Sequence, residues 1–263
     1  MERGIRIMKS NNKNVIFLWS GKVTSDGEFC SCIKSLKKVS DCKITVATPQ
    51  LTKSSVELLK SLDVEIKYFD KSLWDNRRMT CKIEQVNEHL KSLNENDFLF
   101  VYDGDMLFLK DPFGVFLKEF DFLYTTRQTT PGVKEWVQTN GGCIGFKNNK
   151  RARNFLNFFV DNLNNPSWQP YINFRKNHPH NNDLSNLDWW VDQDFSNCIH
   201  TYKNEVNNGE LGFDVKVYDA GPKYNFVCKG QEILNEIKNK DKYVLHCKTA
   251  SFNRWIGGIS IDE

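Results

Sequence analysis

Two acidic residues interrupt an apolar run in the sequence Phe98-Leu-Phe-Val-Tyr-Asp103-Gly-Asp105-Met-Leu-Phe-Leu-Lys-Asp-Pro112. The apolar residues from Phe98 to Tyr102 have no helical spacing, which is typical of a strand buried on both faces. Carboxylates that follow a central strand lie at the edge where open α/β sheets bind ligands. Gly104 leaves no side chain between them, so a bound group could approach the backbone closely. The stretch predicts a ligand site, because an acidic surface turn is unusual between two apolar runs.

Length and composition favour one folded domain. The 263 residues, 40% hydrophobic and 26% charged, are typical of one large α/β domain. The net charge of +3 does not indicate a nucleic-acid partner. The apolar run 15–19 is too short for a signal peptide or a membrane span, and the eight cysteines include no Cys-x-x-Cys pair. We therefore expect reduced thiols, no membrane span and a cytoplasmic protein.

Strands and helices alternate along the chain. The expected strands are 14–21, 43–49, 64–69, 98–102, 122–126, 215–218 and 243–245, and a glycine-rich turn leads into a further strand within 139–146. The expected helices are 28–39, 54–62, 77–93, 113–118, 149–163 and 189–202, with loops at 127–138 and 164–188. This alternation predicts an α/β fold with a mixed, mostly parallel central sheet flanked by helices. We expect it to form a single domain of residues 1–263.

His246 is the natural third partner of the acidic pair. It follows an expected strand in the same way that Asp103 follows Tyr102. Like charges as close as Asp103 and Asp105 are costly unless a cation or a proton neutralises one. Carboxylates bind hard divalent cations, and an imidazole ligand shifts the preference towards transition ions such as manganese. The alternative for His246 is a structural histidine with all its hydrogen bonds satisfied.

Other polar residues allow two interpretations each. Arg78, Lys82, Lys248 and Arg254 could supply positive charge to a phosphate, or could lie on a solvated surface. The glycines of Asn140-Gly-Gly could mark an ordinary turn. Asp192-Gln193-Asp194 follows a tryptophan pair at an expected helix start, where aspartate is also favoured simply as a cap.

The order of these motifs resembles that of the retaining glycosyltransferases with the GT-A fold. The similarity is greatest to glycosyltransferase family 8, the group of glycogenin and the bacterial lipopolysaccharide galactosyltransferases. It extends from about Asn14 to Trp255 and rests on Asp103-Gly-Asp105, Asn140-Gly-Gly, Asp192-Gln-Asp194 and His246. Two motifs depart from the family pattern. The late histidine motif is followed by Cys-Lys-Thr-Ala-Ser-Phe-Asn-Arg-Trp255, and the first strand ends in Trp19-Ser20-Gly21 where an acidic nucleotide contact is usual.

The resemblance implies a role for each motif. Asp103, Asp105 and His246 would hold Mn²⁺ (or Mg²⁺), which bridges the diphosphate of a nucleotide sugar. The resemblance implies that this donor is a UDP-sugar. The expected nucleotide and diphosphate contacts are Trp19, Ser20, Gly21, Arg78, Lys82, Gly104 and Lys248. The expected donor-sugar and acceptor contacts are Asn140, Gly141, Gly142, Trp189, Asp192 and Gln193. Residues 14–126 would thus bind nucleotide and metal, and residues 127–255 the donor sugar and the acceptor.

The function expected from these residues is metal-dependent transfer of a hexose with retention of configuration. Asp192 and Gln193 are the expected catalytic residues, Asp192 orienting the sugar hydroxyls and the carbonyl of Gln193 supporting an oxocarbenium-like centre. Three alternatives remain open at this point. They are a nucleotidyltransferase of similar fold, a phosphatase of the haloacid dehalogenase type with Asp103 as nucleophile, and a non-enzymatic sugar-binding module.

The acceptor is not indicated by the sequence. Aromatic residues gather in the expected loops and just after them, and they suit either stacking on sugar rings or packing in the core. These residues are Trp136, Trp168, Tyr171, Phe174, Trp189 and Trp190.

Overall fold

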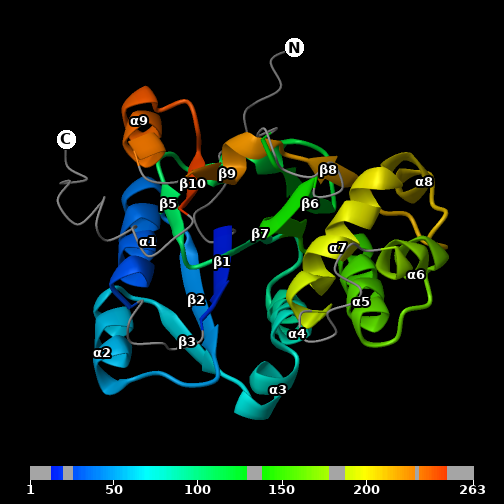
Figure 1. The fold of residues 1–263 in the computed structure, drawn as a ribbon. Helices are drawn as coiled ribbons and strands as arrows, with labels where there is room; N and C mark the ends of the chain where they lie inside the picture. The colour runs from blue at the N-terminus through cyan, green and yellow to red at the C-terminus, as the bar shows by residue number, and fades with distance from the viewer. Residues whose placement is uncertain (1–12, 20–25, 129–137, 178–186, 229–230, 248–263) are drawn as a thin grey trace.

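The fold is built on a central sheet of seven strands, seen in the computed structural model of Figure 1. The structure describes residues 13–19, 26–128, 138–177, 187–228 and 231–247. The strand order is β3 (Glu65–Tyr68), β2 (Lys43–Thr48), β1 (Lys13–Leu18), β4 (Phe98–Tyr102), β7 (Thr139–Lys147), β6 (Phe122–Thr126) and β8 (Val217–Asp219). β7 alone runs antiparallel to its neighbours β4 and β6. The predicted mixed, mostly parallel sheet is therefore confirmed.

Helices cover both faces of this sheet (Figure 1). α1 (Asp26–Val39) and α2 (Lys53–Ser61) pack on one face. α4 (Arg78–Ser92), α5 (Lys150–Asn164) and α7 (Leu187–Thr201) pack on the other. In β4, Phe100 and Tyr102 belong to the first core cluster, whereas Leu99 and Val101 belong to the second. The apolar run of β4 is unbroken because both faces of this strand are buried.

A second, smaller sheet adjoins the carboxyl end of β4. It has the order β5 (Met106–Phe108), β10 (Val244–Cys247), β9 (Phe226–Cys228), and α9 (Gln231–Asn239) packs on it through Ile233. β5 follows the acidic pair directly and pairs antiparallel with β10, so that His246 lies opposite Met106. His246 was expected to follow a strand that ends at Leu245. The strand β10 runs on to Cys247, so His246 lies inside it, one residue before its end.

Several shorter elements lie outside the predicted pattern. They are α3 (Lys71–Asn76), α6 (Gln169–Lys176), α8 (Lys203–Asn207) and a 3-10 helix, Pro222–Tyr224. The short helix expected over 113–118 is present as a 3-10 helix, Pro112–Leu117. α6 corrects the prediction of a loop over 164–188, and Pro170 in its first turn suits a helix start. α3 is capped by Asp70, whose side chain accepts a hydrogen bond from the Ser72 N–H. Residues 139–147 form one continuous strand, so the Asn140-Gly-Gly segment is not a turn.

The aromatic residues after Asn164 serve the core. Tyr171 is 1% exposed, and Trp168 and Phe174 pack against the same cluster as the helices α5 and α7. The packing alternative therefore holds for these three residues. Trp136 and the side chains of Trp189 and Trp190 lie outside the described part of the chain.

The described helices include none with the length and apolar composition needed to cross a membrane. All eight cysteines are buried, and none of them forms a disulfide bond.

Candidate active site at the end of β4

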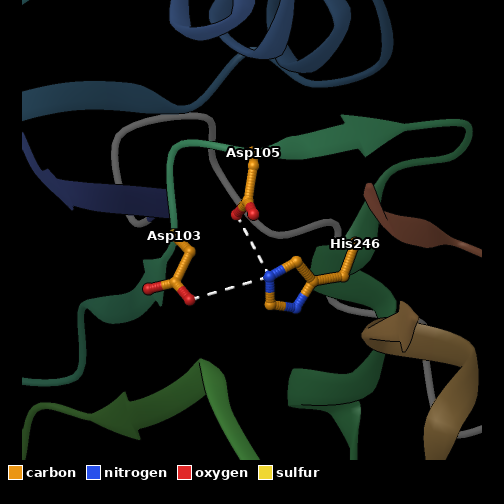
Figure 2. A group of neighbouring side chains, drawn as sticks. All are labelled: Asp103, Asp105 and His246. Atoms are coloured by element: carbon orange, nitrogen blue, oxygen red, sulfur yellow. Dashed lines mark ion pairs between the residues drawn. The ribbon is translucent and has the colours of Figure 1, made fainter. Parts of the chain in front are cut away.

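Asp103, Asp105 and His246 converge on one point, as predicted. Their ligand atoms all lie within 4.8 Å of one another (Figure 2). His246 Nε2 is 3.1 Å from an Asp105 carboxylate oxygen and 3.8 Å from one of Asp103. The two carboxylates project from the turn between β4 and β5, while His246 reaches them from β10. Two segments that are distant in sequence, the turn after β4 and the strand β10, therefore meet around a space lined by two oxygen ligands and one nitrogen ligand.

The hydrogen bonds of Asn225 determine which nitrogen of His246 carries the proton. The Asn225 amide nitrogen donates to Thr125 Oγ1 (3.0 Å) and to the Asn140 carbonyl (3.3 Å), so its oxygen faces His246 Nδ1 at 2.9 Å. Nδ1 is therefore the donor to Asn225, and in the neutral imidazole Nε2 holds the lone pair. His246 is fully buried, and its Nε2 has no hydrogen-bond partner among the described residues. A histidine held through one nitrogen with the other aimed at two carboxylates fits a divalent cation.

Two glycines of β7, Gly141 and Gly142, make room for the site. A Cβ on Gly142 would come within 2.6 Å of His246 Cε1, and one on Gly141 within 3.0 Å of an Asp192 carboxylate oxygen. Gly142 also accepts a hydrogen bond from the Asp103 N–H through its carbonyl. The Asn140 side chain accepts from the Gly142 N–H at 2.9 Å and contacts His246. Asn140-Gly-Gly is therefore part of the site, and the close approach of side chains to backbone explains both glycines.

Lys82 joins the acidic pair to α7. Its ammonium group lies 3.0 Å from Asp103, 3.4 Å from Asp192 and 3.1 Å from the Gly141 carbonyl. Lys82 and Asp192 are each 6% exposed. Burial by itself would lower the pKa of Lys82, but Asp103 and Asp192 outweigh burial and raise it, so the lysine is charged. Burial raises the pKa of Asp192 above its ordinary value, against the opposing effect of Lys82.

Asp192-Gln193-Asp194 lies inside α7 and not at its start, which removes the capping interpretation. Gln193 is 8% exposed, and its side-chain oxygen accepts a hydrogen bond from Arg127 at 3.1 Å. Asp194 is fully buried and faces α6, where Arg175 lies 2.6 Å away. Asp192 and Asp194 thus have different surroundings, because the first pairs with Lys82 and the second with Arg175.

The structure brings together only some of the expected nucleotide contacts. Trp19 lies against the acidic turn, since a Cβ on Gly104 would come within 2.9 Å of its indole ring. The space beside Gly104 that we expected a ligand to use is therefore occupied by Trp19, which also stacks on Phe29. Arg78 opens α4 and lies over the Trp74 ring at 5.2 Å. Ser20, Gly21, Lys248 and Arg254, and the side chain of Trp189, lie outside the described residues.

Sequence comparison identifies no relative, since neither a family model nor a curated protein matches the chain. Solved structures are similar to it in fold. An active-site mutant of LgtC superposes with a TM-score of 0.54 at 10% identity, over 93% of this chain and 94% of that chain. The glycosyltransferase GlyE of Streptococcus pneumoniae TIGR4 gives 0.51 at 14% identity, over 91% of this chain and 56% of that chain.

The chain has the GT-A glycosyltransferase fold. At identities this low the likeness establishes the fold, and the chemistry has to be argued from the residues of this chain.

Two residues of the candidate site were not predicted from the sequence. Asn225 fixes the orientation of His246, and Arg127 fixes that of Gln193. Neither residue belongs to a motif, and both follow positions where the chain leaves one element for the next. Asn225 lies 21 residues before His246, and nothing in the sequence relates the two positions. Their contact can be expected only once β9 and β10 are known to pair.

Gly142→Ala is expected to weaken metal binding by about tenfold or more, since the added methyl group displaces His246 from the carboxylates. Titration with Mn²⁺, followed by calorimetry, measures this loss. Gly114→Ala is the matched control, because a Cβ at Gly114 meets nothing within 4 Å. Equal Mn²⁺ affinity of the Gly142→Ala variant and the wild-type protein would show that His246 is not a ligand.

The buried carboxyl group of Asp194 is expected to make the free energy of unfolding depend on pH. Burial raises its pKa to about 7, although Arg175 opposes the shift. Because the folded-state pKa exceeds that of the unfolded chain, the native state binds the extra proton between about pH 4 and about pH 7. Stability contributed by Asp194 is therefore lost as the pH rises through this window. Urea unfolding of the wild type and of Asp194→Asn should show a free-energy difference that changes across the window and is constant above it. A difference that is constant from pH 4 to pH 8 would contradict this assignment.

Proposed function

We propose that the chain is a metal-dependent glycosyltransferase, which transfers a hexose from a nucleotide diphosphate sugar, a UDP-sugar, to an acceptor hydroxyl. The observation that carries the proposal is the group of Asp103, Asp105 and His246 at the carboxyl end of β4, with the His246 lone pair facing both carboxylates. Two oxygen ligands and one imidazole suit Mn²⁺ better than Mg²⁺, which prefers oxygen ligands alone. The GT-A fold supports this choice of reaction.

A divalent cation at this site supplies a Lewis acid for the leaving diphosphate. The residues of the chain hold and neutralise the reacting groups. Lys82 is charged and lies beside Asp103, so it can share the negative charge that develops on the leaving group. Asp192 lies on the other side of Lys82 and can accept hydrogen bonds from the sugar hydroxyls. Gly141 and Gly142 have no side chain, which lets Asp192 and His246 lie directly against the backbone of β7.

We propose retention of configuration for this transfer. An inverting GT-A enzyme needs a carboxylate base opposite the leaving group. The residue beside Asp192 on α7 is an amide, Gln193, which cannot serve as a base, and Asp192 itself is held by Lys82. The similar structure of LgtC is of an active-site mutant with glutamine replaced by glutamate, which supports a role for an amide at such a site. Proton NMR of the first-formed product from an α-linked donor would then show the α-anomer, and a β-anomer would refute retention.

A nucleotidyltransferase is the alternative that shares this fold class and this metal. It differs in the product, because it releases pyrophosphate where a glycosyltransferase releases a nucleoside diphosphate.

We propose that the protein works in the cytoplasm. Eight buried cysteines without a disulfide bond are typical of a reducing compartment.

A panel of nucleotide sugars tests the proposed function in a thermal-shift assay with and without Mn²⁺. We expect one or more UDP-sugars to raise the melting temperature only when Mn²⁺ is present, since ligand binding to the native state stabilises it. Absence of any metal-dependent shift or turnover across the panel would overturn the proposal.

A further inference from the structure

Arg127, just after β6, holds the side chain of Gln193 by its oxygen atom. Its Nη2 donates to Gln193 Oε1 at 3.1 Å, and its Nε donates to the Thr139 carbonyl at 3.1 Å. A guanidinium group is only a donor, so the amide oxygen of Gln193 must be the atom that faces it. The amide nitrogen of Gln193 is therefore directed elsewhere, and it is buried without a hydrogen-bond partner among the described residues.

The charge on Arg127 changes what the Gln193 oxygen can do. The described carboxylates include none within ion-pair distance of this guanidinium, unlike Arg151 and Arg175, which each pair with an aspartate. A carbonyl oxygen that accepts from an uncompensated cation has less negative charge to offer a positive anomeric centre. The expected stabilisation of an oxocarbenium-like centre by this oxygen is thus disfavoured here.

The strand β7 contacts both Arg127 and the proposed metal ligand His246, so it gives the distance between them. Gly142 contacts His246, Gly141 contacts Asp192, and Thr139 contacts Arg127. Thr139 precedes Gly142 by three residues, which is about 10 Å at ~3.3 Å per residue. A sugar attached to a metal-bound diphosphate would extend about this far. Gln193 lies at this end of β7, since the Thr139 hydroxyl donates to its backbone carbonyl at 3.4 Å, and a sugar hydroxyl or ring oxygen placed there could accept a hydrogen bond from its amide nitrogen.

We propose, resting on the glycosyltransferase function above, that Arg127 is a positioning residue that makes Gln193 a hydrogen-bond donor to an oxygen of the donor sugar. Arg127 binds the amide oxygen, and the amide N–H groups face the substrate. An unsatisfied buried donor costs free energy in the free protein, and a sugar oxygen relieves that cost on binding.

Release of nucleoside diphosphate from the nucleotide sugar that the wild type uses, with Mn²⁺ present, tests this role. Arg127→Met should lower kcat about tenfold without changing Mn²⁺ affinity, and Arg127→Lys should recover part of the loss. Gln193→Glu should lose as much activity as Gln193→Met, because the carboxylate keeps the contact with Arg127 and lacks the N–H groups. In the Gln193→Met background, Arg127→Met should add less than about a twofold loss, as expected for residues that act as one unit.

The matched control is Arg153→Met, which removes a half-buried arginine of α5 that donates to the neutral side-chain oxygen of Asn148. It should leave turnover at the wild-type value, and melting temperatures report on folding of every variant. Wild-type activity in Gln193→Glu would show that the oxygen is the working atom, and multiplicative losses in the double variant would show that Arg127 acts independently. Either result overturns the role of Arg127 alone. Absence of wild-type turnover on every nucleotide sugar overturns both proposals.

Discussion

Asp105→Asn is expected to lower kcat/KM by about 100-fold or more, the largest effect of any single substitution that preserves side-chain volume. The substitution removes one of the two negative charges that face His246 Nε2, from which Asp105 lies 3.1 Å away. Asparagine is a weaker ligand than a carboxylate for a divalent cation, so the metal affinity falls together with the turnover. The Asp105 side chain is 32% exposed, and its replacement leaves the core packing unchanged.

Calorimetric titration with Mn²⁺ and steady-state kinetics measure the two losses. Asp214→Asn is the control, since Asp214 is 64% exposed and pairs with Arg151 at the surface. Wild-type Mn²⁺ affinity in Asp105→Asn would remove Asp105 from the set of ligands.

Lys82→Met is expected to separate turnover from metal binding. Lys82 neutralises Asp103 and Asp192, and without it the charge on the leaving group loses one of its two cationic partners. We expect kcat to fall about 100-fold, while Mn²⁺ binds at least as tightly as in the wild type because Asp103 no longer has a competing cation. A ligand substitution would weaken both properties, so this pattern is specific to a charge that acts on the substrate.

The same substitution should reduce stability at neutral pH by about 3 kcal/mol, since it leaves Asp192 buried without a counter-charge. Burial raises the pKa of Asp192, so its protonated form is favoured in the folded state and part of the loss is recovered as the pH falls. Lys13→Met is a close control. Lys13, the first residue of β1, also lies between two aspartates, with Asp41 at 3.2 Å and Asp111 at 2.8 Å from its ammonium group. Equal turnover in Lys82→Met and Lys13→Met would assign Lys82 a purely structural role.

Local sequence predicted what local forces determine. The apolar run of β4 is continuous because each face of the sheet has its own core, and a carboxylate pair at its end is visible without any knowledge of the fold. The same is true of most helices and strands, whose periodicity follows from one buried face.

The remainder depends on contacts between distant segments. His246 was expected at the end of a strand, but its place in the small sheet follows from pairing with β5, and no local pattern specifies that partner. Gly142 was assigned to a turn because the side chain that excludes a Cβ there comes from β10. Arg127 and Asn225 could not be predicted for the same reason, since each has its role through a single partner that is distant in the sequence.

The most direct test of metal-dependent sugar transfer is the identity of the phosphorus-containing product. Phosphorus NMR of a UDP-sugar incubated with the protein and Mn²⁺ should show UDP formation, which stops when EDTA is added and is absent with Asp105→Asn. UDP formation that persists unchanged in EDTA, or release of pyrophosphate in place of UDP, would contradict the account.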